Sequence, residues 1–402
     1  MRALIAAMAG VALATLPQLG FAAETGMGKG EYLARAADCV ACHTAPGGQP
    51  FAGGRAFQTP FGVIYSPNIT PDAKTGIGGY SDEEFISALQ KGVARGGKHL
   101  YPAMPYSSYT LMTREDVLAV KAYIMGLAPV SNQVAEDKLK FPYNQRALMI
   151  GWNMINNSDH RFEPDAKQSA EWNRGAYVTE ALGHCQQCHT PRNFMQGLKS
   201  SSAYAGAPIQ GWNAYNITSD KTAGIGGWSD ADLASYLSTG HADGHGSASG
   251  PMAEAIENSL RYLTPDDIKA MVTYLKTVPP QPGNAAPAPV SAKPDIALGG
   301  KIFEEACQSC HRANGTGSAT PYAALLGSPS VTDPSGTNLV AVLLYGSHID
   351  TATGAKAMPG FAHGYTDVEL AAVANYTIAQ FGKGTGAVTR EAVAKARSTV
   401  TD

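Results

Sequence analysis

The sequence predicts a mainly α-helical protein built from three small domains in tandem. All six cysteines of the 402-residue chain lie in three C-x-x-C-H segments, at 39–43, 185–189 and 307–311. The segment NITPDAKTGIGGYSD at 68–82 recurs as NITSDKTAGIGGWSD at 216–230, and such repetition marks a duplicated structural unit. A helical pattern also follows each C-x-x-C-H segment and would close its unit. These observations together indicate three helical units, each organised around one cysteine motif.

The closing helices are expected to resemble one another. An acidic residue stands seven positions before a tyrosine in each of them, as Asp116 with Tyr123, Asp267 with Tyr274, and Glu369 with Tyr376. Two further helices are expected at 82–91 and 230–238, with Ser81 and Ser229 as their N-caps. The repeated segment before each of them is interpreted as a surface loop that caps the next helix.

The units are also expected to begin alike. A glycine and an aromatic residue precede each cysteine motif, as Gly30 with Tyr32, Gly175 with Tyr177, and Gly300 with Phe303. We interpret these pairs as packing features. The glycine would let the first helix of a unit cross the last helix closely, and the aromatic ring would fill the remaining space.

These patterns divide the chain into seven segments. The boundaries are a signal peptide at 1–23, a first domain at 24–130, a connector at 131–172, a second domain at 173–278, a Pro/Ala-rich linker at 279–294, a third domain at 295–382 and a polar tail at 383–402.

The N-terminal segment predicts export. Arg2 supplies a positive start, residues 3–16 are apolar, and small residues at 20–23 offer a cleavage site after Ala22 or Ala23. The alternative is a membrane anchor, but the apolar run is shorter than the about 20 residues that a span needs, and Pro17 follows it. No later stretch is long and apolar enough to suggest a span. The net charge of -3 also argues against nucleic acid as a partner.

The cysteine motifs predict covalent haem c. Two cysteines three positions apart lie on one face of a helical turn, where their sulfurs can form thioethers with one haem. The following histidine can then bind the iron. The expected attachment residues are Cys39, Cys42, Cys185, Cys188, Cys307 and Cys310, and the expected proximal ligands are His43, His189 and His311.

Three other uses of the motifs are weaker. A zinc site needs about four ligands in one place, and each motif offers three at most. A redox-active C-x-x-C pair leaves the histidine after every pair unexplained. A structural disulfide within one turn would close a small, strained ring.

The sixth iron ligand is expected to be a methionine in each unit. Met104, Met252 and Met358 each lie between the cysteine motif and the closing helix, and each has a proline beside it. A lone methionine is usually a core gap-filler, but the matching positions favour ligation. Met252 has rivals in His241 and His245, and His99 and His348 are weaker candidates. Two axial ligands leave no open position on the iron, which favours electron transfer over oxidase or peroxidase chemistry.

At this point the chain resembles a known family, the three-haem cytochrome c subunits of the membrane-bound dehydrogenases of acetic acid bacteria and related Gram-negative bacteria. The most specific stretches are ADCVACHTAPGG (37–48), YSPNITPD and GIGGYSDEEF (within 65–85), LYPAMPY (100–106), NITSDKTAGIGGWSD (216–230), SGPMAE (249–254) and AMPGF (357–361). The resemblance covers nearly the whole chain after the signal peptide. It implies three class I-type cytochrome c domains, with haem on the C-x-x-C-H residues and a methionine ligand in each loop named above.

The resemblance also implies a biological setting. Such subunits take electrons from a catalytic dehydrogenase subunit that carries PQQ, FAD or a molybdenum cofactor, sometimes beside a small third subunit. They pass the electrons to ubiquinone, at the periplasmic face of the cytoplasmic membrane. Some members have a hydrophobic C-terminal anchor, whereas this chain ends in a polar tail, so anchoring by the tail is not expected.

Two alternatives to this function stay open, a free periplasmic shuttle to a terminal oxidase or reductase and a self-sufficient haem enzyme. No nucleophile–base pair, nucleotide loop or carboxylate pair has a telling spacing, so this chain alone is not expected to act on a substrate. The connector segment FPYNQRALMIGWNMI (141–155) is apolar with the single charge of Arg146. It is expected either to pack between the domains or against a partner, or to form a membrane-facing surface near the quinone.

Overall fold

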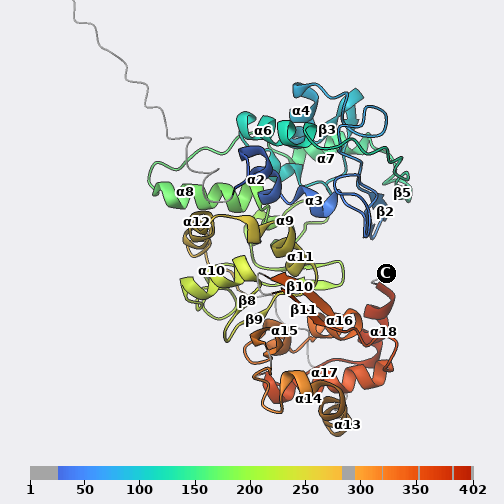
Figure 1. Cartoon of the computed structure of the whole chain (residues 1–402), viewed down its shortest axis with the longest axis vertical. Helices are drawn as coiled ribbons and strands as arrows, with labels where there is room; N and C mark the ends of the chain where they lie inside the picture. The colour runs from blue at the N-terminus through green and yellow to red at the C-terminus, as the bar shows by residue number, and fades with distance from the viewer. Residues whose placement is uncertain (1–25, 283–294, 319, 352–353, 383, 400–402) are drawn as a thin grey trace, which may run out of the picture.

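The computed structural model describes residues 26–282, 295–318, 320–351, 354–382 and 384–399. The predicted signal peptide and most of the predicted linker lie outside these residues. The described chain is mainly α, as predicted, and forms three units that follow one another along the long axis of the molecule (Figure 1). Strands are short and occur only as small sheets of two or three strands in the described residues.

The first unit begins and ends with a pair of crossed helices, α2 and α6. Its elements are α2 (Lys29–Ala36), α3 (Cys39–Cys42), β1 (Ala56–Thr59), β2 (Gly62–Tyr65), α4 (Asp82–Lys91), β3 (Val93–Ala94), η1 (Arg95–Gly97), β4 (Lys98–His99), α5 (Tyr106–Tyr109) and α6 (Arg114–Met125). The connector adds β5 (Lys138–Leu139), which pairs with β2 and gives the sheet order β1-β2-β5, and α7 (Leu148–Asn156).

The second unit repeats this plan. Its elements are α8 (Ala170–Tyr177), η2 (Val178–Leu182), α9 (Gln186–His189), η3 (Ser200–Ser202), β6 (Ala207–Ile209), β7 (Trp212–Ala214), α10 (Asp230–Thr239), β8 (His241–Ala242), β9 (Gly246–Ser247), α11 (Gly250–Asn258), η4 (Leu260–Tyr262) and α12 (Pro265–Leu275). The expected caps are present, because Ser81 and Ser229 accept hydrogen bonds from the backbone at the start of α4 and α10.

The third unit has a different middle section. Its elements are α13 (Ile296–Ile302), η5 (Phe303–Cys307), α14 (Gln308–His311), η6 (Pro321–Ala323), α15 (Pro329–Thr332), α16 (Thr337–Tyr345), β10 (Ser347–Thr351), β11 (Gly354–Met358), α17 (Asp367–Phe381) and α18 (Arg390–Thr399). Helix α18 lies in the predicted polar tail and packs on this unit, with Val393 fully buried and Arg397 paired with Asp367 at 2.9 Å. The third unit therefore extends beyond the predicted end at 382.

A glycine at each helix crossing brings the first and last helices of a unit together. A Cβ on Gly30 would lie 2.1 Å from the backbone oxygen of Ala119, and one on Gly175 would lie 1.9 Å from that of Ala270. In the third unit the close contact belongs to Gly299, where a Cβ would lie 2.2 Å from the backbone oxygen of Ala372, rather than to the predicted Gly300. The two neighbouring glycines could not be told apart by sequence, because only the helix phase decides which one faces α17.

The first two units share one hydrophobic core, which runs without a break from one to the other. Two tyrosines tie them together reciprocally. Tyr32 donates to the carboxylate of Asp267 at 2.6 Å, and Tyr177 donates to that of Asp116 at 2.6 Å. Bonds to a carboxylate are stronger than neutral ones. Burial, followed by the charge of Asp267, raises the pKa of Tyr32 to about 12, so the phenol stays protonated and remains a donor.

The third unit has its own core and docks on the second unit. Asn213 and Asn338 exchange two hydrogen bonds, with distances of 2.7 and 2.9 Å between the nitrogen and oxygen atoms. Ile349 on β10 is buried in the core of the first two units, against Gly240. Burial of such a side chain stabilises the contact by about 1.5–3 kcal/mol. The second unit is thus the middle one, in contact with both others.

Candidate functional site

The three C-x-x-C-H motifs form matching helical turns. Cys39 and Cys42 begin and end α3, while the second cysteine of each later motif lies in α9 or α14. None of the six cysteines forms a disulfide. Burial raises the pKa of the Cys39 and Cys185 thiols to about 12, and each motif offers two sulfurs and one imidazole, one ligand short of the four that a structural zinc site needs. The geometry therefore fits thioether attachment better than zinc binding.

All three motif histidines make the same hydrogen bond. The Nδ1 atom of His43 lies 2.8 Å from the backbone oxygen of Pro67, that of His189 lies 2.6 Å from Tyr215, and that of His311 lies 2.7 Å from Ala323. A carbonyl oxygen only accepts, so Nδ1 carries the proton and Nε2 keeps its lone pair. Burial also lowers the pKa of all three imidazoles, which favours the neutral form that can bind iron. This is the orientation that an iron ligand requires.

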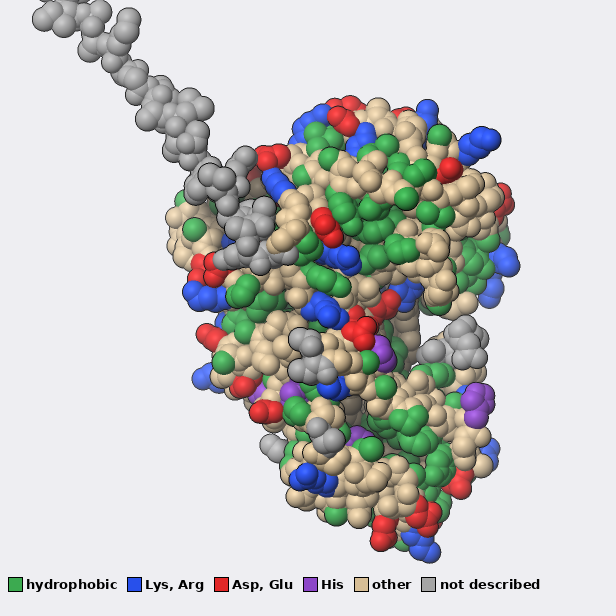
Figure 2. Space-filling model, viewed as in Figure 1, with side chains coloured by type: hydrophobic (Ala, Val, Ile, Leu, Met, Phe, Trp, Pro, Cys, Tyr) green, Lys and Arg blue, Asp and Glu red, His purple; other side chains and the backbone are tan. Residues whose placement is uncertain are grey.

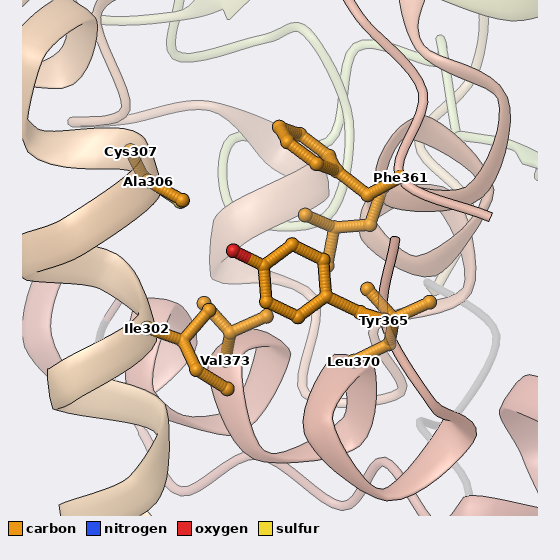
Figure 3. A pocket seen from close by; sticks show the side chains of 8 residues that line it. Ile302, Ala306, Cys307, Phe361, Tyr365, Leu370 and Val373 are labelled. Atoms are coloured by element: carbon orange, nitrogen blue, oxygen red, sulfur yellow. The ribbon is translucent and has the colours of Figure 1, made fainter. Parts of the chain in front are cut away.

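An apolar pocket adjoins the third motif. Figure 3 shows Tyr365 between the helical segment that carries Ile302 and Cys307 and the side chain of Leu370 on α17. The pocket lining is otherwise hydrophobic and includes Ala306, Leu343, Phe361 and Val373. These side chains form an apolar wall beside the attachment residue Cys307, as the apolar faces of a haem would require.

Each candidate methionine lies in or just before a helix, or at the end of a strand, in its unit. Met104 lies in a turn just before α5, Met252 lies in the first turn of α11, and Met358 ends β11. All three are partly buried and pack against the hydrophobic cores. Pro251 occupies the start of α11, where its missing N–H costs nothing and its fixed φ suits the helix.

The rival histidines of the second unit have other partners. The Nδ1 atom of His241 lies 2.9 Å from the hydroxyl of Ser247, and its Nε2 lies 3.1 Å from a carboxylate oxygen of Asp243. His245 stacks on Trp228 with a ring separation of 3.8 Å. These contacts explain both histidines structurally and leave Met252 as the stronger candidate.

The repeated NIT segment has a structural role in this fold. Asn68 accepts from Thr70 and donates to the backbone oxygen of Val130 at 2.7 Å, and Asn216 repeats the pattern with Thr218 and Gln281. Each asparagine therefore ties the loop to the chain that leaves the closing helix.

Sequence reasoning missed the contacts between the first two sites. Gln187, inside the second motif, donates to Ser107 and Ser108, which follow Met104 by three and four positions. Helix α3 packs against α11, which carries Met252. Each attachment turn thus touches the methionine segment of the other unit. The duplicated segment could have revealed that the units are equivalent, but equivalence alone does not say which surfaces meet.

These features define a class of protein, the c-type cytochromes. Two family models agree: "Cytochrome c" matches residues 28–128, and "Cytochrome C oxidase, cbb3-type, subunit III" matches residues 294–376. The chain carries covalent haem c and transfers electrons.

Relatives that match nearly the full length of this chain assign it to a smaller group within the c-type cytochromes. The chain is 38% identical to the fructose dehydrogenase cytochrome subunit of Gluconobacter japonicus, over 96% of this chain and 85% of the relative. It is 38% identical to the gluconate 2-dehydrogenase cytochrome c subunit of Pantoea cypripedii, over 92% and 89%. It is 37% identical to the cytochrome c subunit of the quinone alcohol dehydrogenase of Gluconacetobacter polyoxogenes, over 98% and 88%. The chain belongs to this family of dehydrogenase cytochrome c subunits.

Proposed function

We propose that this chain carries three haems c and conducts electrons from a dehydrogenase subunit to ubiquinone. The haems are attached to Cys39 and Cys42, to Cys185 and Cys188, and to Cys307 and Cys310. Their iron ligands are His43 with Met104, His189 with Met252, and His311 with Met358. The observation that carries the proposal is the common state of the three histidines, each of which donates from Nδ1 to a backbone oxygen.

The number of electrons that a haem accepts points to the kind of partner protein. A dehydrogenase removes two electrons from its substrate, whereas a haem iron takes one at a time, so several haems in contact can accept both. The relatives are named as subunits of fructose, gluconate and alcohol dehydrogenases. We infer a catalytic partner of this kind, with PQQ, FAD or a molybdenum cofactor and with a small third subunit in some complexes. The chain itself binds no organic substrate for oxidation.

The arrangement of the units supports conduction along the chain. The first two sites touch through α3 with α11 and through Gln187. Helix α11 also contacts β10, whose partner strand β11 ends at Met358. The methionine helix of the second unit thus lies between the first and third sites, which supports a path with the second haem in the middle.

Exposed apolar side chains on and near α7 support a role at a membrane. Phe141, Met154 and Ile155 from the connector are 80%, 82% and 68% exposed, and Phe194 from a loop beside α7 is 93% exposed. We call these four residues the α7 patch. Hydrophobic side chains also gather over the first unit on the face seen in Figure 2. No helix in the described ranges is long and apolar enough to cross a bilayer. We infer that the exported chain meets the periplasmic face of the cytoplasmic membrane through the α7 patch.

One aromatic residue of the connector segment 141–155 is buried. Trp152 is only 7% exposed, donates from its indole nitrogen to the backbone oxygen of Met195 at 2.8 Å, and packs edge-on against Tyr106. Of the two alternatives for this segment, packing between the domains therefore applies to Trp152. Through Trp152, helix α7 contacts Tyr106 of the first unit and Met195 of the second, while Met154 and Ile155 on the same helix stay exposed.

The decisive experiment uses the purified chain and the chain with its partner. Alcohols, sugars and aldehydes should leave the haems of the isolated chain oxidised, whereas substrate should reduce them in the co-purified complex. Substrate-dependent haem reduction by the chain free of any second protein would favour a self-sufficient enzyme. Recovery of the chain alone in the periplasmic fraction would favour the free shuttle.

A further inference from the structure

An arginine lies beside the attachment turn in each of the first two units. Arg55 donates from Nη1 to the backbone oxygen of Ala41 at 2.7 Å, and Arg192 donates from Nη2 to that of Gln187 at 2.8 Å. Ala41 and Gln187 occupy the same position, directly before the second cysteine of the motif. The two guanidinium groups come from different points in their loops, yet they stand at matching places beside the first and second haem sites.

The two arginines differ in how their charge is balanced. Both carboxylate oxygens of Glu254 accept from the guanidinium of Arg55 in a bidentate ion pair. The remaining bonds of Arg192 go to neutral acceptors, the backbone oxygen of Gln196 at 3.3 Å and the side-chain oxygen of Gln187 at 3.0 Å. Among the ion pairs of the described residues, none includes Arg192. No carboxylate of the described residues therefore balances its positive charge.

Partial burial of Arg192 strengthens the electrostatic effect of its charge on neighbouring groups. Arg192 is half-buried, and burial lowers its pKa, although a guanidinium stays protonated in a protein. The charge of Arg192 acts on Cys188, an attachment residue of the second haem, whose thiol pKa is raised by burial. Arg192 lowers that pKa, and the carboxyl of Asp38 acts in the opposite direction. Charges interact more strongly away from water, because the effective dielectric constant is lower there. The charge of Arg192 should thus be felt at the second haem more strongly than that of an exposed lysine.

We propose that Arg192 raises the midpoint potential of the second haem above that of the first haem. The iron gains one positive charge on oxidation, so a cation beside it disfavours the oxidised state. At the first haem, the ion pair of Arg55 with Glu254 cancels the matching charge. Electrons shared by the two haems then rest mainly on the second, which is the middle one. The inference rests on the proposed function, since it assumes a haem at both sites.

The test is a spectroelectrochemical titration of the complete, haem-loaded chain. Arg192→Gln should lower the potential of the second haem and leave the first nearly unchanged. Arg192→Lys keeps the charge and should retain most of the potential. Lys199→Gln is the matched control, because it removes an exposed cation from the same loop and should shift neither haem. The second haem is identified as the one whose spectrum changes in Met252→Ala.

The outcomes separate the possible failures. An unshifted second haem in Arg192→Gln overturns the proposal, and so does an equal fall in Arg192→Lys, which would assign the effect to hydrogen bonding. If Arg192→Gln does not mature, Glu254→Gln tests the same electrostatics by exposing the charge of Arg55, and it should raise the potential of the first haem. A wild-type chain whose intact mass lacks the second haem would instead contradict the proposed function.

Discussion

At the residue scale, the candidate iron ligands are distinguished by which histidine ring nitrogens already make hydrogen bonds. The backbone oxygens of Pro67, Tyr215 and Ala323 hold the Nδ1–H groups of the motif histidines, so Nε2 is available to iron. Both ring nitrogens of His241 have polar neighbours, which weakens one of the two rivals of Met252. Hydrogen bonding thus distinguishes ligand candidates that residue type alone leaves equal.

Met252→Ala should remove the sulfur ligand of the second haem. We expect its midpoint potential to fall and the methionine–iron charge-transfer absorption to weaken by about a third, because one of three such ligands is lost. His241→Gln is the matched control and should leave both quantities unchanged. An unaltered spectrum in Met252→Ala, with a changed one in His241→Gln, would transfer the ligand role to His241.

At the element scale, the helix crossings fix each unit around its motif. The repeated sequence revealed the duplicated units, their closing helices and the serine caps of α4 and α10, since these depend on local patterns. It did not reveal that Gly299 rather than Gly300 meets α17, because the exact helix phase is set by packing. It also left open which side of α7 is buried through Trp152, since an apolar run without polar alternation does not mark its buried face.

Gly175→Ala should destabilise the second unit. The new Cβ would lie 1.9 Å from the backbone oxygen of Ala270, so α8 and α12 must move apart, at a cost of about 1–3 kcal/mol. Gly151→Ala in α7 is the matched control, because no atom lies within 4 Å of its Cβ position, and there alanine should be neutral or stabilising. Thermal unfolding followed by circular dichroism compares the two. Equal midpoints for both variants would show that the crossing tolerates a side chain.

At the scale of the whole molecule, the first two units form a fused pair and the third unit docks on its second member. The shared core and the reciprocal bonds of Tyr32 and Tyr177 make the pair one body. The sequence predicted three domains in tandem but not this fusion, because a contact such as that of Tyr32 with Asp267, 235 positions away, leaves no local pattern. The same arrangement brings the methionine segment of each paired unit to the attachment turn of the other.

The α7 patch should be needed for membrane binding and quinone reduction but not for electron transfer through the haems. Met154→Glu with Ile155→Glu should release the complex from membranes and slow quinone reduction, while electron flow to a soluble dye continues, because charge in the patch opposes shallow insertion. Val368→Glu, at a 49% exposed site on α17 of the third unit, is the control and should change neither property. Normal membrane binding by the double variant would mean that the patch contacts a partner protein or nothing.

The central claim, three haems that each carry one electron, is tested most directly by coulometric titration of the purified chain without oxygen. The haem absorption should reach full reduction after three electrons per chain. Cys310→Ala should need only two if that haem is lost, because one thioether attachment of the third haem is gone while the first two sites are untouched. A wild-type chain that is complete after two electrons or fewer would contradict the account.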